Sequence, residues 1–157
     1  MNYEKLLAEK MTPRHVYKIV ETCTFLHGED IKNHLKNCKE IIIFAATLGL
    51  QVDDLIRSLE VSDMAGAVIL DSLASDAIED YCDEIVGAGF SRPTEKRVGR
   101  PHPYTTRFSP GYGDFPLSVQ QDLLTVLNAQ KQIGLYVTDS GILIPRKSIT
   151  AIIGVKS

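Results

Sequence analysis

The spacing of apolar positions divides the N-terminal part of the chain into short segments. Residues 2–10 predict a short helix, and Thr12-Pro13 ends it because proline lacks an N–H group and disfavours a helical residue before it. Residues 16–25 are richer in β-branched side chains and indicate a strand. Asp30 is expected to cap a helix over residues 31–37.

The clearest strand of the sequence covers residues 40–48. Its apolar run is continuous and largely β-branched, without polar alternation, so we expect it to be buried on both faces. Ala45, Ala46 and Gly49 leave little side-chain volume at its end, which permits close approach of another backbone or of a ligand. This segment is therefore predicted to lie at the centre of a sheet.

The longest predicted helix follows a short amphipathic helix over residues 52–59. Ser62 is expected to cap the long helix, which runs to about Val86 and ends at Gly87-Ala88-Gly89. Apolar residues recur along it at spacings of three and four, which predicts a buried stripe formed by Met64, Val68, Ile78, Cys82 and Ile85.

Acidic residues crowd the second half of this helix, at Asp76, Glu79, Asp80, Asp83 and Glu84. Most of them are expected to form a solvated face. Glu79 lies about 100° around the helix from Ile78, at the edge of the predicted buried stripe. Its carboxylate can therefore reach into a cleft.

The second half of the chain alternates loops with short elements. Residues 91–103 hold prolines and basic residues and are expected to form a solvated connecting loop. Later segments predict a strand over 104–108, a helix capped by Ser118 over 119–130 that buries Leu123, Leu124 and Leu127, and strands over 135–138, 142–144 and 149–155. Strands clustered at the C-terminus beside one long helix favour an α+β fold in a single domain over residues 1–157.

The sequence Arg107-Phe-Ser-Pro-Gly-Tyr-Gly-Asp-Phe-Pro116 cannot be the interior of a helix or of a central strand. Pro110-Gly111 suits a type II turn, because proline presets φ at the first corner and glycine accepts positive φ at the second. Arg107 adds a charged fork suited to a carboxylate, and Tyr112 adds a ring with a polar tip. Such a turn suits either a ligand site or a structural loop with Arg107 in a surface ion pair.

Composition narrows the functional classes. A net charge of −3 over 157 residues argues against a nucleic-acid partner, which usually meets a basic face. We expect no signal peptide in the polar first residues, and no apolar run approaches the roughly 20 residues of a membrane span. Cys23, Cys38 and Cys82 are widely spaced and odd in number, which favours reduced thiols and a cytoplasmic protein.

Standard catalytic and nucleotide-binding motifs are missing from the sequence. It contains no GxGxxG, Walker A, HExxH or GxSxG pattern. Cys23, His27, His34 and Cys38 look like a zinc series, but their spacing matches no standard site, so we expect no metal there. The turn at Arg107, the acidic helix edge and the polar turns up to Ser148 suit the binding of a small zwitterion better than self-contained catalysis.

The order of these motifs resembles the S-adenosylmethionine-binding activation domain of cobalamin-dependent methionine synthase, and in particular its small stand-alone bacterial members. The resemblance covers about Pro13 to Val155. Its motifs are Arg107-x-x-Pro110-Gly111-Tyr112, Pro116, Ile133-Gly134-x-x-Val137-Thr138-Asp139-Ser140 and Pro145-x-x-Ser148-Ile149-Thr150.

This resemblance implies a bent antiparallel sheet with flanking helices and S-adenosylmethionine in a shallow groove. It implies that Arg107, Pro110 and Gly111 hold the methionine portion of the ligand, with Tyr112 near the approaching corrin. A helix glutamate of the family that assists the ligand's amino group corresponds to Glu79, with Asp76 as second choice. Ser148, in the last motif, is the remaining candidate.

The implied role is that of a stand-alone module for reductive reactivation of cobalamin in a split methionine synthase, a methyltransferase of methionine biosynthesis. Cobalamin would be carried by a separate corrinoid-binding chain, and a flavodoxin-type protein is the expected electron donor. The chain would not be catalytic alone. Against the family pattern, we expect both termini to be shortened, and the paired tyrosines of the family's C-terminal extension have no counterpart before Ser157.

Two other functions remain open from the sequence. One is a non-catalytic assembly subunit of a corrinoid methyltransferase that has lost ligand binding. The other is a small-molecule sensor, or an enzyme that uses a different nucleotide in the same groove.

Overall fold

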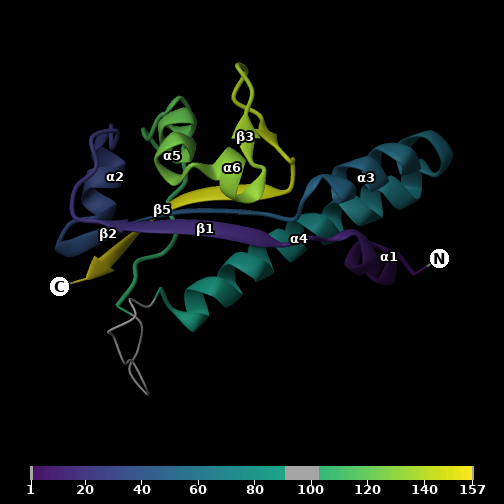
Figure 1. Ribbon diagram of the computed structural model, residues 1–157, viewed down its shortest axis with the longest axis horizontal. Coiled ribbons are helices and arrows are strands. Elements are labelled where there is room, and N and C mark those ends of the chain that lie inside the picture. Colours follow the sequence, from purple (N-terminus) through teal and green to yellow (C-terminus); the bar gives the residue numbers. More distant parts are fainter. Residues whose placement is uncertain (1, 91–102, 157) are drawn as a thin grey trace.

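A three-stranded antiparallel sheet lies at the centre of the computed structural model, which describes residues 2–90 and 103–156. The strand order is β1 (Arg14–Val20), β2 (Cys38–Thr47) and β5 (Ser148–Lys156) (Figure 1). The middle strand β2 is buried along most of its length, as the continuous apolar run predicted. The loop predicted over residues 91–103 falls almost wholly outside the described residues.

Helices cover both faces of this sheet. On one face lies α4 (Met64–Ala88), with α1 (Tyr3–Lys10) and α3 (Leu50–Ser62) packed against it beyond the end of the strands (Figure 1). On the other face lie α2 (Glu29–His34), α5 (Val119–Leu127), α6 (Ala129–Ile133) and the hairpin of β3 (Tyr136–Val137) and β4 (Leu143–Ile144) (Figure 1). Successive side chains of β2 point to opposite faces of the sheet: Phe44 packs in the hydrophobic core between the sheet and α4, and Ile43 packs in the core between the sheet and α5. The predicted α+β class is confirmed, and the predicted order of helices and strands holds except over residues 104–108 and 119–130.

Helix α4 differs from its prediction at its start. Asp63, not Ser62, is its N-cap, and its side chain accepts a hydrogen bond from the N–H of Gly66 at 3.0 Å. Met64 and Val68 are exposed, so their predicted burial is wrong. The buried positions of α4 are Gly66, Ala67, Leu70, Ala74, Ile78 and Cys82. Small residues turn inward there because α3 and α1 pack closely against this part of α4.

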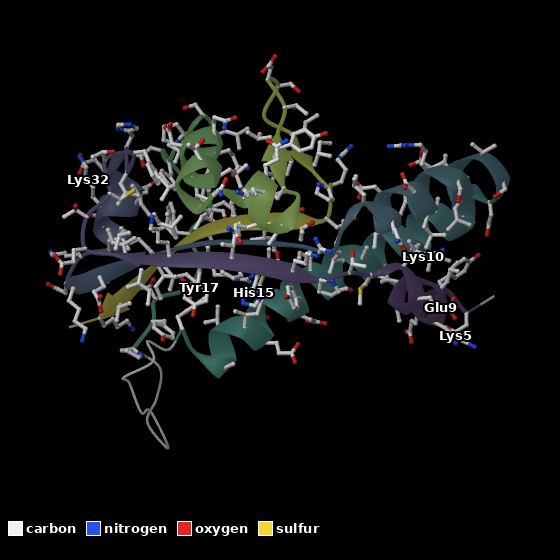
Figure 2. The ribbon with its side chains drawn as sticks, in the orientation of Figure 1. Lys5, Glu9, Lys10, His15, Tyr17 and Lys32 are labelled. Atoms are coloured by element: carbon white, nitrogen blue, oxygen red, sulfur yellow. The ribbon has the colours of Figure 1, made fainter. Side chains whose placement is uncertain are left out.

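Aromatic side chains hold the second half of α4 against the sheet. His15 and Tyr17 of β1 project towards α4 in Figure 2, and His15 Nδ1 lies 2.9 Å from the hydroxyl of Tyr81. The Tyr17 ring packs edge-on against Phe90, just beyond the helix, with centroids 4.8 Å apart. Burial lowers the pKa of His15, so the ring is neutral at neutral pH. These contacts fix the helical turns that carry Glu79.

The predicted helix over residues 119–130 is divided in two. Asn128 adopts φ 52°, a left-handed conformation that ends α5 and begins α6. Ser118 is the N-cap residue of α5, as predicted, but it has helical dihedral angles and its side chain makes no capping hydrogen bond. Leu123, Leu124 and Leu127 are buried, as predicted from their spacing.

Residues 104–108 run along the outer edge of β5 as an extended segment rather than a regular strand. Tyr104 and Phe108 form isolated bridges with Val155 and Ile152. The N–H of Phe108 donates to the carbonyl of Ile152 at 3.0 Å, and the N–H of Ile152 donates back at 2.8 Å. The strand predicted here is therefore bonded to β5 at a few positions, and the chain leaves the sheet after Phe108.

The loop that follows is tied to the start of α2 by a reciprocal pair of aspartates. Asp114 accepts hydrogen bonds from the N–H groups of Glu29 at 2.8 Å and Asp30 at 2.9 Å. Asp30 in turn accepts from the N–H of Asp114 at 3.1 Å. The predicted capping of this helix by Asp30 is thus wrong, because the helix begins at Glu29 after its N-cap Gly28, and the distant Asp114 accepts the free N–H groups. Gly28, at φ 113°, is required here because a Cβ would lie 2.7 Å from the Asp114 carbonyl oxygen.

Asp114→Ala is expected to lower the melting temperature at pH 7. The N–H groups of Asp30 and Glu29 hold the pKa of Asp114 below its ordinary value of 3.8, so its ionised form is stabilised in the folded state. This contribution is present above the unfolded-state pKa and is lost as pH falls through the lower folded-state pKa. The difference in melting temperature between the two proteins should therefore shrink in acid.

Thermal denaturation followed by circular dichroism between pH 7 and pH 2 measures this difference. Asp139→Ala is the matched control, since Asp139 is exposed in another loop. Equal melting temperatures for Asp114→Ala and the parent protein at pH 7 would contradict the capping role.

Candidate functional site

A groove of about 700 Å³ lies between the second half of α4, the extended segment after Tyr104 and the start of β5. This volume is in the range of small-molecule sites. Its polar lining residues are Glu79, Asp83, Tyr104, Thr105, Thr106, Arg107, Ser109, Tyr112, Gln120, Ser148 and Thr150. The groove is therefore lined by residues from both helical layers and from one end of the sheet.

Arg107 occupies this groove with its guanidinium group bound to two acids of α4. Its Nη2 atom lies 2.7 Å from Glu79 Oε2 and 3.0 Å from Asp83 Oδ1. The arginine side chain is 18% exposed, whereas the two carboxylates are 56% and 71% exposed. The Nη1 atom is buried without a hydrogen-bond partner among the described residues. The cluster carries two negative charges against one positive charge, so its net charge is negative.

The turn beside Arg107 has the geometry that Pro110-Gly111 predicted. The N–H of Tyr112 donates to the carbonyl of Ser109 at 3.1 Å, and Gly111 adopts φ 98°. A residue with a side chain would be strained at that φ. The Tyr112 ring is 54% exposed and packs edge-on against Phe108 with centroids 5.8 Å apart. The turn thus presents an aromatic ring at the rim of the groove.

The edge of β5 supplies a polar wall. The backbone groups of Ile152 and Gly154 form hydrogen bonds with residues 105–108. Every second residue of a strand points its backbone N–H and C=O groups to the same edge, so those of Thr150 also point to this edge, where Thr150 lines the groove. The hydroxyl of Thr150 donates to Gln120 Oε1 of α5. Ser148 Oγ bonds to Thr47 Oγ1 at 2.7 Å and to the carbonyl of Pro145 at 2.6 Å. Ser148 therefore positions the turn before β5.

Only some of the site residues predicted from the sequence lie together in the structure. Arg107, Pro110, Tyr112, Glu79 and Ser148 line the same groove. Gly111 belongs to its turn without lining it, and Asp76 lies outside the lining residues. Sequence reasoning did not assign Asp83, Gln120 or Thr150. The spacing of four residues between Glu79 and Asp83 places both on one helical face and is the signal that points to Asp83.

Cys82 is fully buried near Arg107 and is protonated at neutral pH. Burial raises the pKa of its thiol to about 11, and the nearby Arg107 charge opposes this rise only in part. Among residues 2–90 and 103–156, no group of three or more histidine, cysteine, aspartate or glutamate side chains is arranged to hold a metal. None of the described helices is both long and apolar enough to cross a membrane.

Comparison with known proteins identifies the fold. No family model matches the sequence, and no curated protein matches it. A solved structure, described as the crystal structure of the MetH reactivation domain bound to AdoHcy, matches with a TM-score of 0.68 at 19% sequence identity. The match covers 97% of this chain and 61% of that chain. The protein therefore has the α+β fold of the MetH reactivation domain, as the resemblance of its motifs predicted.

Proposed function

We propose that the chain binds S-adenosylmethionine in the groove beside Arg107 and supports the reductive remethylation of cobalamin carried by a separate methionine synthase chain. The observation that carries this proposal is the cluster of Arg107, Glu79 and Asp83 next to the Gly111 turn. The similarity in fold to a domain crystallised with AdoHcy supports a ligand of this chemical class.

The charges of the cluster suit the amino-acid end of this ligand. Its carboxylate would pair with the guanidinium of Arg107, which can donate two parallel hydrogen bonds. Its ammonium would take the place of Arg107 beside Glu79, with Asp83 as a second acid. Ligand binding would thus exchange one set of ion pairs for another, and no charge would be left unpaired.

The remaining residues of the groove would orient the ligand. Thr150 offers backbone groups at the edge of β5, and Gly111 keeps the turn free of a side chain. Tyr112, exposed at the rim, would contact the partner's corrin. The ligand supplies the methyl group for the reduced cobalt, and a flavodoxin-type donor supplies the electron. The chain's own contribution is positioning, which accords with a protonated Cys82.

A second function is favoured by the same ion pairs. Because Glu79 and Asp83 already bind Arg107, the chain can also be an assembly subunit of a corrinoid methyltransferase that no longer binds a ligand. In that case Arg107 joins α4 to the loop and stabilises the fold. The two functions differ in one measurable property, the affinity of the groove for S-adenosylmethionine.

Isothermal titration calorimetry with S-adenosylmethionine and with S-adenosylhomocysteine tests the proposal. We expect saturable binding of both compounds. The sulfonium compound should bind about 5- to 10-fold more tightly, because its extra positive charge lies near a cluster of negative net charge and such pairs are worth about 1 kcal/mol. The preference should diminish at high salt. No heat with either ligand would contradict ligand binding and favour the assembly subunit.

A further inference from the structure

A second, smaller cavity of about 260 Å³ lies between α3, α4 and the turn that enters β5. Its lining residues are Asp53, Ile56, Arg57, Glu60, Asp71, Arg146 and Lys147. None of these residues lines the groove at Arg107. The cavity is therefore a separate feature, and almost every side chain around it is charged.

Asp53 is the unusual residue of this cavity. It is only 8% exposed, and its Oδ2 atom accepts a hydrogen bond from the N–H of Arg146 at 2.8 Å. Its Oδ1 atom is buried without a hydrogen-bond partner among the described residues. A buried carboxylate oxygen without a donor is unfavourable, because it has lost its water and gained nothing in return. The wall of the cavity thus includes a buried carboxylate with one unpaired oxygen.

The positive groups of the cavity are only partly used. Lys147 Nζ binds Asp71 Oδ1 and Ser75 Oγ, each at 2.8 Å. Among the described residues, Arg57 makes one ion pair, a long one of 3.7 Å with exposed Asp54. No hydrogen bond or ion pair is present for the Arg146 guanidinium within residues 2–90 and 103–156. Two guanidinium groups therefore remain available to an anion.

Once the pair of Lys147 with Asp71 is set aside, the cavity is lined by two acids, Asp53 and Glu60, and two arginines, Arg57 on the same helix α3 and Arg146 on the turn before β5. A single anion would pair only with the arginines, and a single cation only with the acids. We propose that this cavity is a binding site for a small zwitterion of the amino-acid class, with its ammonium towards Asp53 and Glu60 and its carboxylate towards Arg57 and Arg146. The volume accommodates a molecule of that size.

The position of the site gives it a direct structural readout. Arg146 and Lys147 line this cavity, while Ser148, next in the chain, lines the groove of Arg107. The N–H of Arg146 is also the group that Asp53 holds. Occupation of the cavity should consequently change the backbone amide signals of residues 146 and 147.

The test is a titration of the ¹⁵N-labelled chain with 4-aminobutyrate, glycine and 6-aminohexanoate, followed by amide chemical shifts. At least one zwitterion should shift the amides of residues 146 and 147 in a saturable manner. n-Butylamine and butyrate, each carrying one of the charges, should bind at least about 10-fold more weakly, since a hydrogen bond to a charged group is worth about 1.5–3 kcal/mol. Equal binding of butyrate alone would overturn the zwitterion in favour of a simple anion site.

Variants separate this site from the groove. Asp53→Asn should weaken zwitterion binding by about 10-fold or more, and Arg146→Gln, which keeps the backbone N–H bond, should do the same. Arg107→Gln should leave these shifts unchanged, so the result is independent of the proposed function. Saturation that is lost only in Arg107→Gln, or no shift with any zwitterion, would overturn the inference.

Discussion

Arg107→Gln is expected to weaken the binding of S-adenosylmethionine by about 100-fold in calorimetry. Removing one partner of a buried charge pair weakens the binding free energy by about 2–5 kcal/mol, and each 1.4 kcal/mol corresponds to about tenfold in affinity. Glutamine retains a polar group of similar reach but cannot donate two charged hydrogen bonds to a carboxylate. The loss should therefore fall on the amino-acid end of the ligand.

Arg14→Gln provides the matched control, because Arg14 is an exposed arginine on β1, away from the groove. It removes the same charge and should bind the ligand as the parent protein does. A parent-like affinity in Arg107→Gln, together with a lower melting temperature, would show that Arg107 serves only to join α4 to its loop.

Phe44→Ala is expected to lower the free energy of unfolding by about 3–5 kcal/mol, as is typical of large-to-small changes at buried aromatic positions. Phe44 lies in the middle of the central strand β2, is fully buried, and packs edge-on against Phe90 with centroids 5.8 Å apart. The cavity left behind cannot collapse easily, because β2 is bonded to strands on both sides. Urea denaturation measures the change.

Val61→Ala is the control for this experiment. Val61 is 90% exposed at the end of α3, so its replacement should change the free energy of unfolding by no more than about 0.5 kcal/mol. A loss below about 1 kcal/mol in Phe44→Ala would contradict the central place of β2 in the core.

Features that depend on neighbouring residues could be predicted from the sequence. The apolar run of β2 and the spacing of Leu123, Leu124 and Leu127 reflect burial directly, and Pro110-Gly111 encodes its own turn. The start of α4 was predicted wrongly because Ser62 and Asp63 are both good capping residues. Met64 and Val68 were misassigned because close packing of α3 favours small residues over large ones at the contact.

Features that depend on distant residues could not be predicted. Nothing local to Asp114 indicates that it caps α2, and the spacing of Asp83 from Glu79 places both on one helical face without indicating that Arg107 binds both. The break at Asn128 also escaped the helical pattern, since Leu127, Ala129 and Gln130 around it are good helix formers. The pairing of Arg107 with Glu79 was indicated only by the resemblance to the methionine synthase activation domain, which implied that both residues lie near one ligand.

The reciprocal aspartates have a consequence for any attempt to transplant the Gly111 turn into another protein. Asp114 reaches Asp30 across 84 positions of sequence, so the turn keeps its shape only while α2 stays docked. The two should open and close as one cooperative unit in hydrogen exchange, rather than as independent loops. A graft that carries the decapeptide without α2 would have to supply new donors for the orphaned carboxylate.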